Sequence, residues 1–153
     1  MIDYAAKEYF EFVKQLETDP FFCIKYITTI DKSNPTFALC EKTISQDPMC
    51  ALNYADNMKR RFVLGEEAIA TDAKTAFLYA KDIMKSRFEM GEKAISQDPQ
   101  FAYKYALFII RGRWEVGEEA ISKDSKMLLA YAKEVIKGKL PEELHNVMIA
   151  KRI

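Results

Sequence analysis

The feature that most constrains the fold of this chain is an internal repeat with a period close to 26 residues. Four aspartates recur at intervals of 25, 26 and 26 residues: Asp47, Asp72, Asp98 and Asp124. A Tyr-Ala pair keeps the same intervals, with its tyrosine at Tyr54, Tyr79, Tyr105 and Tyr131. A large apolar residue recurs every 26 residues, at Phe62, Phe88, Trp114 and Leu140. A period of this length is typical of arrays in which each copy is one supersecondary unit.

Each copy has the pattern of two short helices. The first helix begins just after the aromatic residue, and Trp114, Gly117 and Ile121 fall on one helical face. The second helix begins at the aspartate, which is a favoured N-cap, and a proline follows it in "DP" at 47–48 and 98–99. Gly112 and Gly138 follow the second helix, so we expect them to form its left-handed C-cap.

Helices this short are marginal in isolation and need neighbours to bury their apolar faces. The sequence therefore predicts an all-α fold, a short α-solenoid of two-helix repeats with N- and C-terminal capping helices. We assign residues 1–153 to a single domain, with a divergent N-terminal cap at 1–34, repeats at 35–140 and a C-terminal cap at 141–153. A glycine recurs inside each first helix, at Gly65, Gly91 and Gly117. We expect the neighbouring second helix to approach closely there.

The composition argues against several classes of protein. Lys plus Arg and Asp plus Glu both number 23, so the basic excess of a dedicated nucleic-acid binder is missing. Cys23, Cys40 and Cys50 form no CxxC pair, and His145 stands far from them, which argues against a disulfide framework or a zinc site. No signal peptide and no 18-residue apolar stretch occurs. We expect a cytoplasmic protein without cofactor, metal or membrane span.

The recurring polar residues favour a structural role. Tyr26 and the four repeated tyrosines lie on a core stripe, so each ring is expected to be buried with its hydroxyl bonded to a polar partner. A glutamate recurs at Glu41, Glu66, Glu92 and Glu118. Pairs of cations recur at the junction between helices, at Lys59 and Arg61, Lys85 and Arg87, Arg111 and Arg113, and Lys137 and Lys139. We interpret these charges as Arg–Glu pairs and helix-terminus charges. The alternative is a basic ridge that binds an anion or a nucleic acid.

No set of residues supports catalysis. An acid–base pair needs two carboxylates in contrasting environments, whereas this chain repeats the same carboxylate. The three cysteines occupy small apolar positions, and His145 lies in the cap. We therefore expect that the protein is not an enzyme.

One departure from the repeat predicts a partner-binding surface. The two positions after Tyr-Ala are polar in the other copies, for example Lys133 and Glu134, but here they are Leu107 and Phe108. The position before the tyrosine is apolar in Leu78. If these positions face solvent, Leu107, Phe108 and Leu78 form an exposed apolar patch that binds a protein partner or mediates self-association. The alternative is that these side chains belong to a repacked core.

The segments "YALFIIRGRWEVGEEAISKDS" and "YAKDIMKSRFEMGEKAISQDP" also carry a resemblance. They are similar to the form "YAxxVIKGRWPEAExxIAxDP" of short α-helical repeats in poorly characterised proteins of large tailed phages and some giant viruses. The resemblance covers residues 37–140, and it departs at Gly91 and Gly117, where the family often has alanine. It implies a helical array, a viral or phage source, and a host-encoded protein partner in the host cytoplasm that the protein inhibits or modulates. It carries no catalytic residues.

Overall fold

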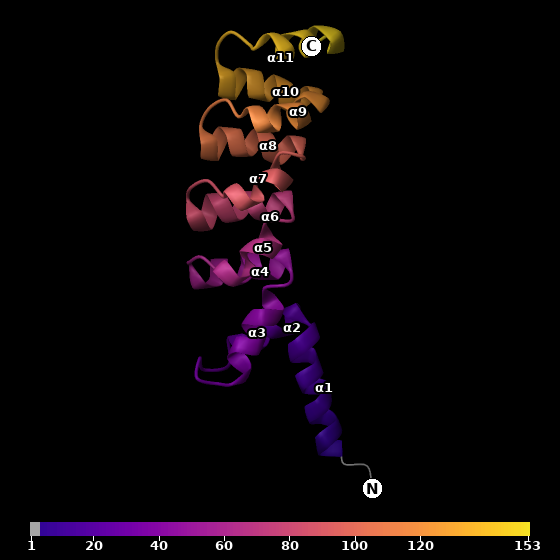
Figure 1. Ribbon diagram of the computed structural model, residues 1–153, viewed down its shortest axis with the longest axis vertical. Helices are drawn as coiled ribbons and strands as arrows, with labels where there is room; N and C mark the ends of the chain where they lie inside the picture. The colour runs from indigo at the N-terminus through magenta and orange to yellow at the C-terminus, as the bar shows by residue number, and fades with distance from the viewer. Residues whose placement is uncertain (1–3) are drawn as a thin grey trace. The chain divides into compact units, whose positions relative to one another are not determined.

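The computed structural model describes residues 4–153, and every regular element among them is a helix, with no strand (Figure 1). The all-α prediction is confirmed. These residues form two compact units, one ending at Ile69 and the other beginning at Ala70. The boundaries assigned to the caps, the repeats and the single domain stay predictions.

Unit 1, the described residues up to Ile69, contains α1 (Tyr4–Thr18), α2 (Pro20–Ile27), α3 (Thr36–Ile44), α4 (Pro48–Met58), the 3-10 helix η1 (Val63–Gly65) and α5 (Glu66–Ile69). Residues 1–3 of the assigned N-terminal cap lie outside the described residues. The core side chains Leu16, Cys23 and Ile44 are fully buried. The buried Leu16 carbonyl, near the end of α1, accepts a hydrogen bond from the Thr43 hydroxyl at 2.6 Å.

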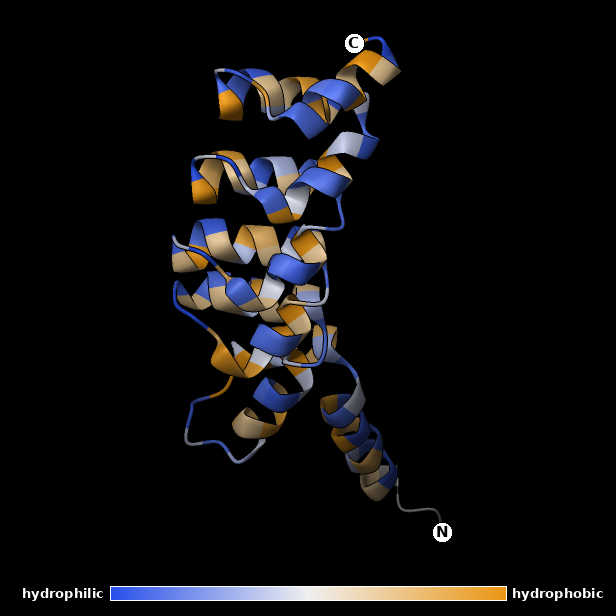
Figure 2. Ribbon diagram, turned by 45° about the horizontal axis from the view of Figure 1, so that its top comes forward, coloured by the Kyte–Doolittle hydropathy of each residue, from blue (hydrophilic) through white to orange (hydrophobic). Residues whose placement is uncertain are grey.

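Unit 2, from Ala70 onward, contains three second helices that each continue into a π-helix: α6 (Ala73–Leu78) with η2 (Tyr79–Met84), α8 (Pro99–Tyr105) with η3 (Ala106–Ile110), and α10 (Ser125–Tyr131) with η4 (Ala132–Ile136). The first helices are α7 (Glu89–Ile95), α9 (Glu115–Lys123) and α11 (Glu142–Lys151). α6, α8 and α10 are successive neighbours, and each packs on the helix that follows it (Figure 1). Figure 2 shows hydrophobic and hydrophilic residues alternating along these helices, as expected when each buries one face.

The predicted aspartate N-caps are confirmed. Each aspartate is extended, and its carboxylate accepts the backbone N–H three residues later, at 2.8 to 2.9 Å. The capping residues are Asp47, Asp72, Asp98 and Asp124. Asp19 caps α2 in the same way. Each cap satisfies a backbone donor that the helix itself cannot satisfy.

The predicted close approach at the recurring glycines is also confirmed. A Cβ at Gly91 would stand 2.7 Å from the Cβ of Ala76 on α6, and one at Gly117 would stand 3.1 Å from the Cβ of Ala102 on α8. The aromatic ring three residues earlier folds over each glycine, which the sequence reasoning missed. A Cβ at Gly91 would lie 2.7 Å from the Phe88 ring. These positions therefore require glycine for packing rather than for backbone conformation.

The predicted glycine C-caps are wrong. No glycine among the described residues has a positive φ. The residue in the left-handed conformation is instead a cation, which in two copies is the residue directly before Gly112 or Gly138. The four left-handed cations that end the second helices have φ between 51° and 59°: Lys59, Lys85, Arg111 and Lys137. The π-helix does not cause this, because Lys59 is left-handed after α4, which stays α-helical to its end. In all four copies the left-handed residue lies three positions before the recurring large apolar residue.

Candidate functional site

The most exposed aromatic side chain of unit 2 is Phe108 on η3, which is 49% exposed. It lies over Phe77 of α6, with 6.5 Å between ring centroids. Phe77 also contacts Phe101 of α8, with 5.9 Å between centroids. Phe77 is buried and Phe101 half-buried, so only the outer rings of this aromatic cluster (Phe77, Phe101 and Phe108) reach solvent.

Two lysines flank the exposed rings. The Lys81 Nζ lies 6.0 Å from the Phe108 ring centroid, and the Lys104 Nζ lies 5.2 Å from the Phe101 centroid. Ammonium groups at this range are attracted to the face of an aromatic ring. The Lys81 Nζ is also 3.7 Å from the Asp82 carboxylate. The cluster is therefore an apolar surface with cations at its edge.

The predicted patch is brought together only in part. Phe108 is exposed, and the equivalent positions Asp82 and Glu134 are exposed too, so this position faces solvent as assumed. Leu78 and Leu107 are half-buried. Leu107 lines a small hollow with residues of η4, including Val135, whereas Phe108 meets Phe77.

Sequence reasoning missed Phe77 and Phe101. The signal for Phe101 was present, because Phe101 and Phe108 are seven residues apart, which places them on one helical face. Phe77 lies on a different helix and gave no such signal.

The recurring tyrosine, glutamate and arginine form one hydrogen-bonded network in unit 2. The Arg87 guanidinium donates to both oxygens of Glu92, at 2.8 Å each. The same carboxylate accepts from the Tyr105 hydroxyl at 2.9 Å. The Tyr105 hydroxyl in turn accepts the backbone N–H of Phe88 at 2.9 Å. This arrangement satisfies the N–H of a residue that no helix pairs.

The next copy repeats the network. Arg113 donates to Glu118, and Tyr131 donates to the same carboxylate at 3.0 Å. The backbone N–H of Trp114 donates to the Tyr131 hydroxyl at 2.8 Å. Burial, followed by smaller effects that include the neighbouring carboxylate, raises the pKa of the Tyr131 phenol, so the hydroxyl stays neutral at ordinary pH. The network links two helices through hydrogen bonds among its own polar groups.

Unit 1 contains a partial version of the network. Tyr54 donates to Glu41 at 2.9 Å, and Arg61 pairs with Glu66 at 2.8 Å. Tyr26, which we had grouped with the repeated tyrosines, departs from them. It is only half-buried and packs its ring against Phe12 and Phe22.

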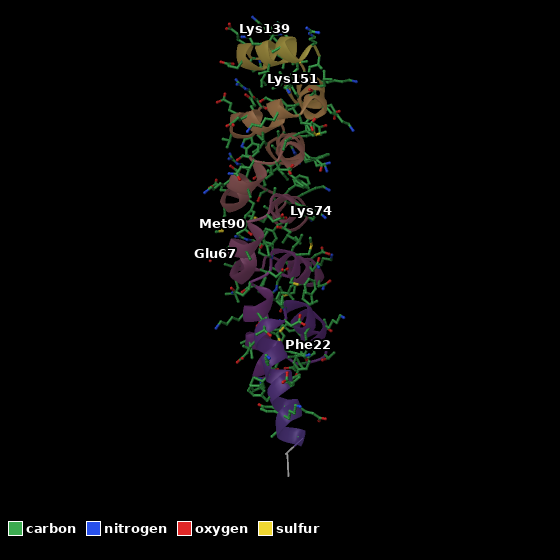
Figure 3. All side chains as sticks on the ribbon, turned by 90° about the vertical axis from the view of Figure 1, so that its right-hand side faces the viewer. Phe22, Glu67, Lys74, Met90, Lys139 and Lys151 are labelled. Atoms are coloured by element: carbon green, nitrogen blue, oxygen red, sulfur yellow. The ribbon has the colours of Figure 1, made fainter. Side chains whose placement is uncertain are left out.

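The predicted basic ridge divides into two groups. Four of its cations are in ion pairs: Arg61, Arg87 and Arg113 with glutamates, and Lys59 with Asp56 at 2.7 Å. Within residues 4–153 the other four have no ion pair, namely Lys85, Arg111, Lys137 and Lys139. Lys139, which is exposed, is labelled near the C-terminal helix in Figure 3.

The remaining reactive side chains are placed as expected. Cys23, Cys40 and Cys50 are free and fully buried, and burial raises the pKa of the Cys23 and Cys50 thiols to about 12. Such thiols are poor nucleophiles. His145 is exposed on α11. The described residues contain no cluster of three potential metal ligands.

None of the helices between residues 4 and 153 combines the length and hydrophobicity needed to cross a bilayer. No protein-family model, no curated protein and no solved structure matches this chain.

Proposed function

We propose that this chain is a non-enzymatic helical-repeat protein whose two-helix copies stack as a short α-solenoid and bind a protein partner. The stacking proposal is supported within unit 2, where α6, α8 and α10 are successive neighbours and each packs on the following helix. The repeated spacing of Asp and Tyr supports its extension to the other copies.

The observation that carries the binding proposal is the exposure of Phe108 above Phe77 and Phe101. An exposed aromatic ring is costly at a position that other copies fill with Asp82 or Glu134. Aromatic side chains in a cluster supply much of the binding energy at protein interfaces. The flanking Lys81 and Lys104 add a polar edge of the kind that surrounds such centres.

We infer the kind of partner from the resemblance to phage and giant-virus repeats. The partner is then a host-encoded protein in the host cytoplasm, such as a defence factor, and this chain inhibits or modulates it. Self-association through the same cluster is the alternative outcome of the test below.

Nucleic-acid binding through the basic ridge is a weaker proposal. Four of the eight cations are engaged by carboxylates, and an engaged cation contributes less to phosphate binding. Its test is binding of RNA or DNA at low salt, where Arg111→Ala should reduce both the affinity and its salt dependence.

The test compares three variants: the single variant Phe108→Asp, the double variant that combines Leu107→Lys and Phe108→Asp, and the control Met90→Lys. Met90, labelled in Figure 3, is a matched control because it is an apolar side chain of unit 2 that is 54% exposed and lies on α7, which contributes no ring or lysine to the cluster. Each variant is used to capture partners from host lysate, and the captured protein is then titrated. We expect Phe108→Asp to weaken binding by about 2 kcal/mol, roughly 30-fold, and Met90→Lys to leave it unchanged.

Melting temperature and sedimentation equilibrium separate the remaining outcomes. If both Phe108 variants stay folded and bind the partner normally, the aromatic cluster is not the site. If they unfold, Phe108 belongs to the core and the proposal fails. A wild-type dimer that Phe108→Asp dissociates identifies self-association instead.

A further inference from the structure

Unit 1 contains a hollow of about 540 Å³ that the proposed function does not use. It lies between the end of α2, the link that joins α2 to α3, and the end of α4. Its apolar wall is formed by Ile24, Ile27, Ile30, Phe37 and Met58. The volume falls within the range of small-molecule pockets, about 300–1,000 Å³, and such pockets are also lined mainly by apolar side chains.

The hollow is built from the parts of unit 1 that depart from the repeat. The link over residues 28–35 is longer than the turns that join the helices of later copies. Two side-chain turns hold it. Asp31 accepts the Ser33 N–H at 2.9 Å, and Asn34 accepts the Thr36 N–H at 2.9 Å. α4 is also one residue shorter at its end than the helices of unit 2, and its last residue, Met58, faces the hollow.

Arg60 is the third departure. The residue two positions before the recurring aromatic is Arg60 here, whereas the later copies have Ser86, Gly112 and Gly138. Its guanidinium contacts the Met58 sulfur at 3.6 Å, and no carboxylate in the described part of the chain forms an ion pair with it. The adjacent Arg61 is bound to Glu66. Arg60 therefore offers an unneutralised cation next to an apolar wall.

The hollow is lined by two cations, Arg60 and Lys32, and by one carboxylate, Asp31, so its charged lining is net positive. Lys32 lines it and is exposed. The Asp31 carboxylate is turned into the link, where the Ser33 N–H lowers its pKa. Tyr54 also lines the hollow, and its hydroxyl already donates to Glu41. Arg60 and Lys32 are thus the groups that can meet a ligand's charge.

We propose that this hollow binds a small amphipathic anion, with an apolar chain against Ile27, Phe37 and Met58 and a carboxylate or phosphate at Arg60 and Lys32. A guanidinium can bind either anion with two parallel hydrogen bonds. The apolar chain supplies burial, and the cations select against a neutral ligand of the same length. This site is independent of the aromatic cluster in unit 2.

The experiment titrates the full chain with decanoate, decyl phosphate and decanol, each below the concentration at which it forms micelles. Calorimetry gives the affinity, and amide chemical shifts give the location. We expect saturable binding of one or both anions at a single site, with shifts centred on Ile27, Phe37 and Met58. The preferred head group distinguishes a carboxylate site from a phosphate site.

Two variants and one control variant test the assignment. Arg60→Ser introduces the residue of the next copy and should weaken anion binding at least tenfold while leaving decanol binding unchanged. Lys42→Ser removes the same charge elsewhere in unit 1 and should have no effect. Asn57→Phe places at the mouth the residue that Phe108 provides in unit 2, and should block all three probes. Absence of saturable binding to the folded wild-type protein, or binding that neither Arg60→Ser nor Asn57→Phe changes, would overturn the proposal.

Discussion

The second helix of a copy ends in two different ways. In unit 1, α4 stays α-helical to Met58, and Lys59 takes the left-handed conformation. In unit 2, α8 passes into the π-helix η3, and Arg111 takes that conformation. The sequences differ by one residue over this stretch, because Phe62 is the eighth residue after Tyr54 whereas Trp114 is the ninth after Tyr105.

This difference shows where the repeat can absorb a residue. The interval from the capping aspartate to the tyrosine is seven residues in all four copies, and the interval from the left-handed cation to the next large apolar residue is three. Hydrogen bonds fix both ends of the first interval, at the N-cap and at the tyrosine hydroxyl. The extra residue therefore lies between the two intervals, after the tyrosine and before the left-handed cation. A π-turn accommodates one residue there without breaking the helix.

The hydrogen bonds of the recurring tyrosine also differ between the two units. The Tyr105 hydroxyl serves both Glu92 and the Phe88 N–H. In unit 1 the corresponding N–H, that of Phe37, donates to the Asn34 carbonyl at 2.9 Å, and Tyr54 bonds only to Glu41 among the described hydrogen bonds. The long link before α3 has replaced one function of the tyrosine.

The largest expected effect comes from deleting one residue on either side of Tyr105. Deletion of Lys104 turns Tyr105 by about 100° around the helix and removes its ring from the core, so we expect a loss of at least about 3 kcal/mol in unfolding free energy. Deletion of Ile109 converts the copy to the length found in unit 1 and should cost only about 1–2 kcal/mol, the burial of part of one side chain. Urea denaturation measures both. Equal losses would contradict the idea that the π-turn is where length varies.

A smaller effect is expected from removing tyrosine hydroxyls. Tyr105→Phe leaves the buried Phe88 N–H unpaired and should cost about 1–3 kcal/mol, whereas Tyr54→Phe removes one hydrogen bond and should cost about 0.5–1.5 kcal/mol. Thermal or chemical unfolding compares the two variants directly.

The pH dependence of stability provides a control for the tyrosine comparison. Burial raises the pKa of Tyr105 above its unfolded value of about 10. Its stabilisation is therefore fully present below about pH 10 and is lost as the pH rises through the folded pKa. Tyr105→Phe should reduce the loss of stability in that alkaline range. A Tyr105→Phe protein as alkali-sensitive as the wild type would show that this phenol is not the group responsible.

The smallest effect concerns the left-handed cations. Arg111→Gly should stabilise unit 2 by about 0.5–1 kcal/mol, because glycine adopts a positive φ without steric cost. Lys59→Gly should gain less, since it also loses the ion pair with Asp56. Differential scanning calorimetry would detect the Arg111 shift. A destabilised Arg111→Gly protein would indicate that the contacts of the arginine side chain contribute more stability than its positive φ costs.

Local patterns were sufficient for much of the fold. The aspartate caps and the starts of α7 and α9 after Phe88 and Trp114 follow from spacings within one helix or one turn. The close approach at Gly91 and Gly117 was predicted from the recurrence of a glycine inside each first helix. The Arg87–Glu92 pair, five residues apart, was within reach of the same reasoning. Pro141, the first residue assigned to the C-terminal cap, lies at the N-cap of α11 rather than inside the helix.

The sequence by itself determined that this chain is helical and where most of its helices begin, because capping and apolar periodicity act over a few neighbouring residues. Only the tertiary structure decided that a π-turn absorbs the variable residue and that Arg111 rather than Gly112 takes the left-handed conformation. It also placed Phe77 beneath Phe108 and Arg60 beside the hollow of unit 1. Those contacts join residues from different helices, and their distances depend on packing that no spacing along the chain specifies.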